Sequence, residues 1–182
     1  MKTYEITRYA FNELSSQAQE RAIEKIRESE SENYPQELLS EIMNQQASYL
    51  LAGHYDGLAK DLNLYYDLSH SQGSGVAFSG EIFKEQAPNL TLPENCYRVV
   101  IKHSGRYYHE YSFDIELYDI DYEEIEESES VLEQLRDICR QLERYGYKWE
   151  ENYFSDTNMK ELAENMGEVF TEAGLISDPV RS

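Results

Sequence analysis

Basic residues are scarce in this chain. Of its 182 residues, 36 are Asp or Glu and only 16 are Lys or Arg, which gives a formal net charge of −20 at pH 7. A charge of this sign and size repels phosphate backbones at long range and attracts basic surfaces. We therefore expect no strong direct binding to nucleic acid, and we expect a basic protein as the partner.

Cysteine is also rare, and long apolar runs are missing. Cys96 and Cys139 lie far apart and form no C-x-x-C pair, which argues against a disulfide scaffold and against a zinc knuckle. No stretch of about 18 apolar residues occurs, and the amino terminus has no apolar run typical of a signal peptide. The sequence therefore predicts a cytoplasmic protein that does not enter a membrane.

The chain still has enough apolar material for a core. Hydrophobic residues make up 40% of it and aromatic residues 13%, and its length falls within the range of one domain. The order of patterns predicts a single α+β domain over residues 1–182, with an antiparallel sheet of about four to five strands packed by helices from both ends of the chain. Its predicted parts are a helical segment 10–53, a central sheet 62–118 and a helical segment 122–174.

Apolar residues at helical spacing predict four helices, and alternation over residues 2–9 predicts a strand before them. Capping and breaking residues mark the ends of the helices. The first helix begins at Ser16 with a Ser16–Gln19 capping box and ends in the polar run 28–33, and the second has Pro35 in its first turn and closes at Gly53. The third and fourth predicted helices carry stripes of apolar residues over 132–142 and 159–170, and the fourth ends near Gly174.

The middle of the chain has the alternation of strands. Residues 62–69 and 76–83 predict two strands around a glycine-rich loop. Residues 96–103 and 106–118 flank Ser104-Gly105, which predicts a two-residue turn that pairs His103 with Arg106. Side chains alternate along the second arm. Its core face is predicted to hold His109, Tyr111, Phe113, Ile115 and Leu117, and its outer face Tyr108, Glu110, Ser112, Asp114, Glu116 and Tyr118.

Motifs of enzyme chemistry are weak. The four histidines show no H-E-x-x-H or H-x-H spacing. Asp119 and Asp121 have the chemistry of a Mg²⁺ pair, but a dense acidic run gives no reason to choose these two. Gly73 and Gly75 either cradle an anion or allow a tight turn, and the turn alone explains the composition. We expect no catalytic residue, no metal and no cofactor.

The densest feature is the acidic run, with nine carboxylates from Asp114 to Glu129. One or two acids near residue 129 suit the start of a helix, because the helix dipole favours negative charge there. Like charges one turn apart, such as Glu123 and Glu127, oppose folding by about 0.2–0.5 kcal/mol a pair. On a helix, the five acids of residues 123–129 approach one charge per about 2 Å, close to the roughly 1.7 Å of duplex DNA. Two interpretations remain open, a solvated acidic face and a partner-binding face.

Two segments resemble known phage proteins. The opening YAFNELSSQAQERAIEKIRE and the later YDLSHSQGSGVAFSG resemble a group of small phage and prophage proteins with an F-x-E-L-S helix and an S-Q-G-[DS]-G-x-x-F-x-G loop. Many of those relatives have Asp where this chain has Ser74. In size, amino-terminal pattern and acidity, the whole chain resembles a type II-A anti-CRISPR protein, an inhibitor of an RNA-guided Cas nuclease.

The resemblance implies an acidic inhibitor that acts in the cytoplasm of a bacterial host cell. Its partner would be a guide-loaded Cas nuclease, whose positively charged channel and motif-reading arginines suit an acidic surface. An antitoxin or an inhibitor of another DNA-binding enzyme would use the same recognition, and a metal-dependent nuclease or nucleotide hydrolase is the alternative from another class. The oligomeric state is not readable from the sequence. The predicted partner-binding residues are Glu110, Asp114, Glu116, Tyr118, Asp119, Asp121, Glu123, Glu124, Glu126 and Glu127.

Overall fold

The computed structural model describes residues 7–126 and 128–177. Within them, helices and a five-stranded antiparallel sheet confirm the predicted α+β class. The structure also contains two short 3-10 helices, η1 and η2. The elements in chain order are η1 (Phe11–Glu13), α1 (Ser16–Glu32), α2 (Gln36–Ala52), β1 (Leu62–Asp67), β2 (Gly75–Phe83), η2 (Lys84–Gln86), β3 (Arg98–His103), β4 (Phe113–Tyr118), β5 (Glu124–Ile125), α3 (Glu129–Tyr153) and α4 (Asp156–Asn165).

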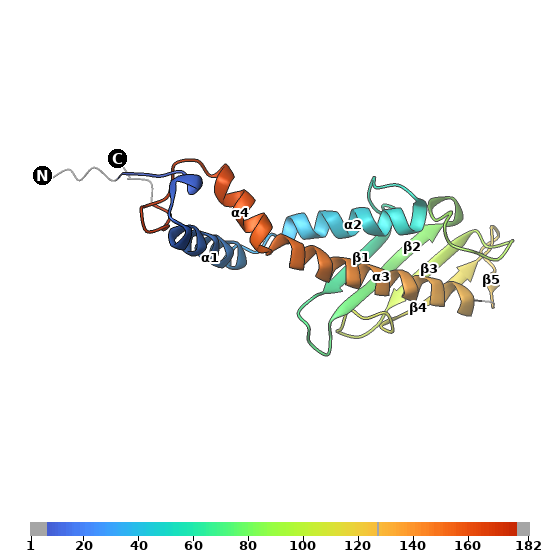
Figure 1. Ribbon diagram of the computed structural model, residues 1–182. Coiled ribbons are helices and arrows are strands. Elements are labelled where there is room, and N and C mark those ends of the chain that lie inside the picture. Colours follow the sequence, from blue (N-terminus) through green and yellow to red (C-terminus); the bar gives the residue numbers. More distant parts are fainter. Residues whose placement is uncertain (1–6, 127, 178–182) are drawn as a thin grey trace, which may run out of the picture. The chain divides into compact units, whose positions relative to one another are not determined.

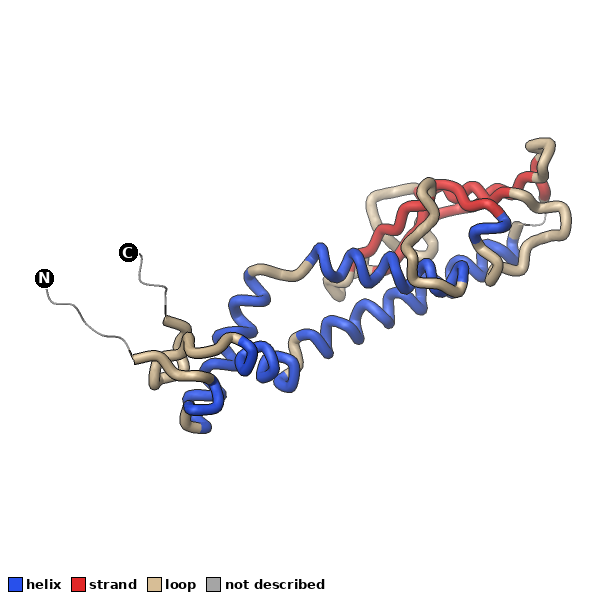
Figure 2. The backbone as a smooth tube through the Cα atoms, turned by 90° about the horizontal axis from the view of Figure 1, so that it is seen from above, coloured by secondary structure: helices blue, strands red, loops and turns tan. Residues whose placement is uncertain are grey.

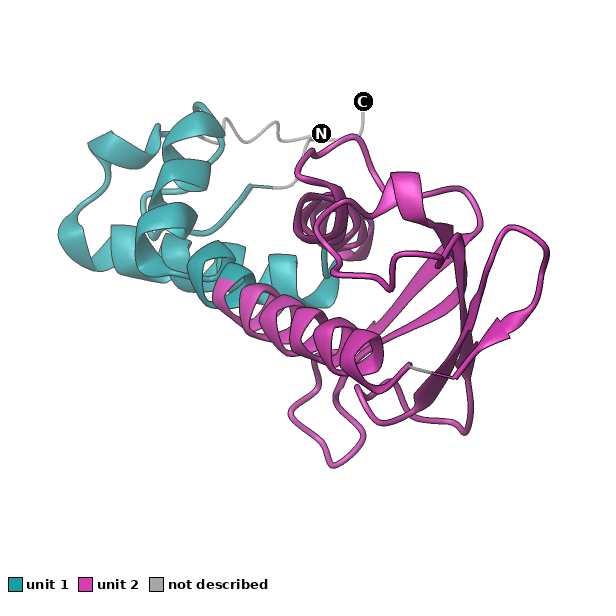
Figure 3. Cartoon of the chain, turned by 90° about the vertical axis from the view of Figure 1, so that its right-hand side faces the viewer, with its two compact units in different colours: residues 1–35, 149–182 teal, residues 36–148 magenta. Residues whose placement is uncertain are grey.

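The chain divides into two compact units, coloured separately in Figure 3. The first contains residues 1–35 and 149–182, and the second contains residues 36–148. The boundaries therefore fall just before α2 and within α3. The sequence-based prediction of one domain over the whole chain stays a prediction. All the predicted partner-binding residues belong to the second unit.

The sheet of the second unit follows the order β1-β2-β3-β4-β5, and each strand pairs antiparallel with the next. Its helices, α2 and the part of α3 in this unit, lie on one side of the sheet (Figures 1 and 2). Side chains that point to that side are buried, as predicted for Phe113, Ile115 and Leu117 of β4. In the described part of the chain no helix covers the other face, and Asp114, Glu116 and Tyr118 point there by alternation.

Helix α3 forms where its apolar stripe predicts it. Leu135, Ile138, Cys139 and Leu142 recur at helical spacing and are buried. The stripe ends at Gly146, where an added Cβ would lie 2.6 Å from Leu68 and 3.2 Å from the sulfur of Met43. Glycine at this position therefore lets the helix backbone approach the segment after β1 and the facing helix α2.

The first unit packs α1, α4 and η1 around one apolar cluster. Within it the rings of Phe11 and Phe170 meet edge to face at 6.1 Å. Ser15, and not Ser16, caps α1, since its side chain accepts a hydrogen bond from the Ala18 N–H. The predicted capping box was therefore wrong by one residue.

The last predicted helix is shorter than its apolar stripe. α4 ends at Asn165, and Gly167 follows with a φ of +75°, which favours glycine and breaks the helix. Phe170 then forms an isolated bridge with Tyr9. The predicted strand 2–9 lies mostly outside the described residues, and within them only this bridge at Tyr9 remains of it.

The β3–β4 hairpin exists, but its predicted turn was wrong. His103 pairs with Phe113 and not with Arg106, so the connecting loop comprises residues 104–112. The Ser104 N–H donates to the Ser112 carbonyl at 2.7 Å, which closes the base of this loop. Consequently His109 and Tyr111 do not lie on the core face of a strand, and Tyr108, Glu110 and Ser112 do not lie on its outer face.

The acidic run also folds differently from the prediction. Glu124 and Ile125 form β5, which pairs with Tyr118 and Leu117 of β4. α3 begins only at Glu129, so this is the one acid of residues 123–129 that lies in the first helical turn. The estimate of helical like-charge repulsion and the helical charge spacing therefore do not apply to residues 123–126. Glu127 lies outside the described residues.

Candidate functional site

The β4–β5 turn is built on the first carboxylate of its sequence. The Oδ1 atom of Asp119 accepts hydrogen bonds from the backbone N–H groups of Asp121 and Glu123, each at 2.9 Å. The Asp119 N–H in turn donates to the Glu123 carbonyl at 3.0 Å. A short side chain such as Asp commonly fixes a tight turn by accepting a hydrogen bond from the backbone N–H two residues later in the chain. Asp119 therefore has a structural role, although the sequence alone assigned it to partner binding.

Arg98 holds the turn against the sheet. Its guanidinium lies 5.0 Å from the ring centroid of Tyr118 and 5.0 Å from that of Tyr122. Its Nη1 atom also lies 2.9 Å from the Oε2 atom of Glu81 on β2. Tyr122 has a φ of +63°, a left-handed conformation that costs a non-glycine residue roughly 1–2 kcal/mol. The contact with Arg98 offsets part of that cost, so this arginine positions the hairpin.

The tip of the hairpin exposes apolar and acidic side chains together. Ile120 is 70% exposed and Tyr122 is 65% exposed. The turn also exposes four carboxylates that have no ion pair and no side-chain hydrogen bond among the described residues, those of Asp121, Glu123, Glu124 and Glu126. We call residues 119–126 the acidic hairpin.

One of the two carboxylates of β4, that of Glu116, is paired with neighbouring groups. Lys102 of β3 pairs with Glu116, and the Tyr118 hydroxyl donates to the same carboxylate at 2.8 Å. The bond from Lys102 holds the pKa of Glu116 below its usual range, and the bond to Glu116 raises the pKa of Tyr118. Asp114 is exposed and sits opposite Lys102 in the register. The open face of the sheet is therefore mixed in charge and not an acidic strip.

A shallow hollow of about 650 Å³ on this open face shows the same mixture. Its cations come from the loop before β1 and from β3, and its carboxylates from that loop, β2 and β4. The charged residues that line it are Lys60, Asp61, Glu81, Arg98, Lys102 and Glu116.

Glu110 lies away from the other predicted residues. Its side chain is only 12% exposed, and its Oε2 atom lies 3.1 Å from Nδ1 of His109. Burial raises the pKa of Glu143 on α3, and the charge of Glu110 raises it further. Burial likewise raises the pKa of the Cys139 thiol, with a smaller contribution from Glu110. The loop 104–112 thus turns Glu110 toward α3, and its assignment to the outer face of a strand was wrong.

The structure accordingly brings together only part of the predicted site. The acidic hairpin contains Asp119, Asp121, Glu123, Glu124 and Glu126, while Asp114, Glu116 and Tyr118 lie on the adjoining open face. Sequence reasoning missed Arg98, Ile120 and Tyr122. The last two stand between acids in the segment 119–124, and apolar residues inside such a polar turn were the available signal.

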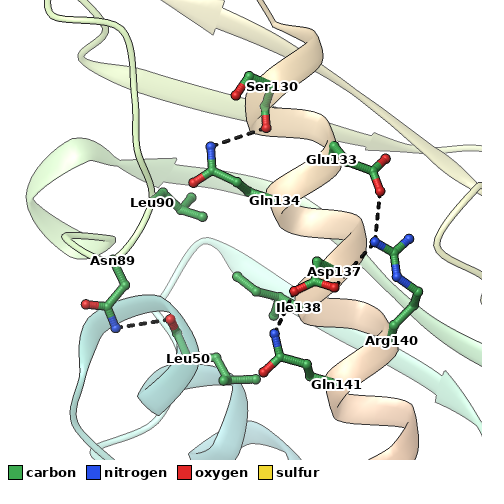
Figure 4. A pocket seen from close by; sticks show the side chains of 10 residues that line it. All are labelled: Leu50, Asn89, Leu90, Ser130, Glu133, Gln134, Asp137, Ile138, Arg140 and Gln141. Atoms are coloured by element: carbon green, nitrogen blue, oxygen red, sulfur yellow. Dashed lines mark hydrogen bonds and ion pairs between the residues drawn. The ribbon is translucent and has the colours of Figure 1, made fainter.

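Another hollow of the second unit is a groove beside α3 (Figure 4). It measures about 600 Å³ and has Leu90 and Ile138 among its apolar lining residues. Its two carboxylates are engaged, because Arg140 lies 2.8 Å from Glu133 and 3.4 Å from Asp137. The groove therefore offers no free acid or base for catalysis.

A serine, a histidine and an aspartate meet near the end of α2. Ser48 Oγ lies 3.4 Å from Nδ1 of His54, and Asp56 Oδ2 lies 3.5 Å from the same nitrogen. A catalytic relay needs the serine on one ring nitrogen and the carboxylate on the other. Ser48 is also buried. This trio therefore lacks the geometry of a hydrolase site, and no metal-binding group of three His, Cys, Asp or Glu occurs in the described part of the chain.

No protein-family model, curated protein or solved structure matches this chain. Among the residues that the structure describes, no helix combines the length and the apolar character needed to span a bilayer.

Proposed function

We propose that this chain is a protein inhibitor that binds a basic nucleic-acid-binding protein through the acidic hairpin. The observation that carries the proposal is the pair of exposed apolar side chains, Ile120 and Tyr122, among exposed carboxylates that form no ion pair and no side-chain hydrogen bond within the described ranges. Binding hot spots commonly consist of a few large side chains surrounded by a polar rim. Charges of one sign around them speed the encounter with a surface of the opposite sign.

The proposed partner is a guide-loaded Cas nuclease, because the chain resembles type II-A anti-CRISPR proteins in its size, its amino-terminal pattern and its acidity. Such a nuclease holds its heteroduplex in a positively charged channel and reads the adjacent motif with arginines. Carboxylates form strong paired hydrogen bonds with arginine. The acidic hairpin would occupy that surface and exclude target DNA, or prevent cleavage, by stoichiometric binding and without catalysis.

The proposed mode of binding is nucleic-acid mimicry by the acidic hairpin. Asp121, Glu123, Glu124 and Glu126 place four carboxylates within six residues. A basic groove that accepts the phosphates of a nucleic acid would attract such a surface.

Co-purification with the guide-loaded nuclease and a cleavage assay test the proposal. The test variant reverses Asp121, Glu123, Glu124 and Glu126 to Lys, and we expect it to lose binding and inhibition. The control variant reverses four exposed carboxylates of the first unit that likewise form no ion pair and no side-chain hydrogen bond with any residue the structure describes, and it should keep both functions. Both variants change the net charge equally, so a difference between them reports on the hairpin. The control residues are Glu20, Glu24, Glu161 and Glu168.

A second variant separates the apolar contact from the charge. Ile120→Ala leaves every carboxylate in place and removes an exposed side chain, so it should not lower the stability of the free protein. Loss of a hot-spot contact of about 2 kcal/mol corresponds to roughly a 30-fold weaker complex. Unchanged inhibition by both the charge-reversed variant and Ile120→Ala would refute the hairpin as the interface.

Two further outcomes identify other functions. Hairpin-dependent capture of a different DNA-binding enzyme from a bacterial lysate, with no binding to the Cas nuclease, would replace the partner and keep the interface. Turnover of DNA or nucleotides by the protein alone, dependent on Mg²⁺ or Mn²⁺ and abolished by a chelator, would instead show a metal-dependent enzyme.

A further inference from the structure

Acidic residues are sparse at one end of the sheet, where Asp67 of β1 lies opposite Gly75 of β2. They make up 36 of the 182 residues, yet none occurs in residues 68–80 or 95–109. These stretches contain the loop between β1 and β2 and the first half of the loop between β3 and β4. The two loops lie side by side at the end of the sheet away from the acidic hairpin (Figure 1). Carboxylates are therefore sparser at this end of the sheet than in the acidic hairpin.

The two loops fit closely because one of them is built from glycine. An added Cβ at Gly73 would lie 2.4 Å from the ring of Tyr107, and one at Gly75 would lie 2.7 Å from the carbonyl oxygen of Tyr108. Both contacts are shorter than any real Cβ tolerates, so a side chain at either position would separate the loops. The glycines of the S-Q-G-S-G segment thus allow the two loops to pack together. The sequence alone had left two roles open for them, a tight turn and an anion cradle.

Aromatic rings gather where the loops meet. The ring of Tyr65 on β1 stacks on that of Tyr108 at 5.3 Å, and the His103 ring lies 5.7 Å from each of them. Tyr107 is 48% exposed and Tyr111 is 64% exposed. We call this surface the aromatic end, and it comprises Tyr65, His103, Arg106, Tyr107, Tyr108 and Tyr111.

The cations of this end have aromatic partners. The Arg106 guanidinium lies 4.6 Å from the ring centroid of Tyr107, and Arg136 of α3 lies 5.0 Å from that of Tyr111. Among the described residues Arg106 forms no ion pair with a carboxylate. Glu110, the first acid after this stretch, is turned toward α3 and paired with His109. Asp114, beside Lys102, marks the boundary with the mixed open face.

We propose that the aromatic end binds a short segment of single-stranded nucleic acid. Bases stack on tyrosine rings and on guanidinium planes, and arginine suits a phosphate as a hydrogen-bond donor. A duplex offers no unstacked bases, and the net charge of −20 repels its dense phosphates. The partner that fits exposed rings with few cations is therefore one flexible strand. This inference does not depend on the proposed function, because it concerns the opposite end of the sheet and a free ligand.

Fluorescence anisotropy of the purified full chain with labelled oligonucleotides tests the inference. The probes are oligothymidine and oligouridine of about 12 nucleotides, within the usual site size of such surfaces, and a duplex of equal length. We expect both single strands to bind and the duplex to bind more weakly; the two single-strand arms distinguish DNA from RNA. With about two phosphates contacted, log affinity should fall with log salt at a slope of about −1.4.

Two matched substitutions connect binding to the surface. Tyr107→Ala should weaken binding about 5- to 150-fold, the effect of roughly 1–3 kcal/mol for one stacked base, whereas Tyr107→Phe keeps the ring and should retain most of the affinity. Tyr55→Ala is the control, because Tyr55 is 55% exposed and stacks on Tyr49 outside the aromatic end. It should bind like the unmodified chain.

Three results would overturn the inference. Neither single strand binds at low salt, or Tyr55→Ala and Tyr107→Ala weaken oligonucleotide binding equally, or the duplex binds as tightly as the single strands. A protein-binding role would appear as a fourth, in which oligonucleotides do not bind but Tyr107→Ala weakens a protein complex. If Tyr107→Ala fails to fold, Tyr111→Ala decides the question, because Tyr111 belongs to the same surface and is 64% exposed. Its loss should weaken single-strand binding, and unchanged affinity of this variant would overturn the inference.

Discussion

Arg98→Ala should release the acidic hairpin from the sheet. The substitution removes the two ring contacts at 5.0 Å, with Tyr118 and Tyr122, and the ion pair with Glu81 at 2.9 Å. Each cation–π contact is worth about 0.5–1 kcal/mol at such sites, and the partly exposed ion pair about 0.2–1 kcal/mol. Together they amount to roughly 1–3 kcal/mol. For a chain of this length, a loss of about 2 kcal/mol lowers the melting temperature by roughly 4–8 °C.

The local consequence should exceed the global one. The substitution removes the cation–π contact that offsets part of the left-handed conformation of Tyr122, which costs roughly 1–2 kcal/mol. We therefore expect the amides of residues 119–123, which are bonded within the turn, to lose protection from hydrogen exchange. The amides of β2 and β3 should keep theirs. Loss of hairpin order should also weaken binding of the proposed partner.

Urea unfolding and native-state hydrogen exchange measure the two effects. Arg98→Lys is the matched control, because it keeps a charge beside Glu81 but lacks the planar guanidinium, and its effect should be intermediate. Stability of Arg98→Ala within about 0.5 kcal/mol of the unmodified chain, together with unchanged exchange in residues 119–123, would show that Arg98 does not position the hairpin.

Two other predictions concern backbone strain and pH. Gly80→Ala should unfold the second unit or lower the free energy of unfolding by at least about 3 kcal/mol. Its Cβ would lie 2.0 Å from the carbonyl oxygen of Asp61, and the φ of Gly80 is +109°. Gly105→Ala, whose Cβ would meet open space, should lower it by about 1 kcal/mol in the same urea assay. Burial and Glu110 raise the pKa of Glu143 above its ordinary 4.5, so its proton binds more tightly in the folded state, and this stabilisation is lost as pH rises through the folded pKa. Glu143→Gln should therefore raise the melting temperature at neutral pH more than at pH about 4, and an equal effect at both would contradict the assignment.

Local patterns in the sequence determined much of the fold. The stripe from Leu135 to Leu142 predicted α3, and the alternation of Phe113, Ile115 and Leu117 predicted which face of β4 is buried. These predictions succeeded because burial of an amphipathic segment repeats with the period of its own backbone. Several turns of helix or several residues of strand are enough to show that period.

Elements too short to show a periodic pattern of apolar residues could not be predicted from the sequence. β5 has two residues, too few to alternate, and it exists because β4 offers Leu117 and Tyr118 for pairing. Because of this pairing, Glu124 and Ile125 of the acidic run form a strand, and the charge spacing expected for a helix does not apply to them. The Ser104-Gly105 pair has the composition of a tight turn, but the longer loop 104–112 packs against residues 73–75 and overrides that local preference.

For the candidate site, the sequence by itself determined that carboxylates outnumber cations and that nine of them lie between Asp114 and Glu129. Only the tertiary structure decided which of them are free to bind. Asp119 fixes a turn, Glu116 meets Lys102, and Glu110 faces α3, while Asp121 and its neighbours in the acidic hairpin face solvent. The reason is physical: charge belongs to a residue, whereas an available charge depends on neighbours that come from distant parts of the chain.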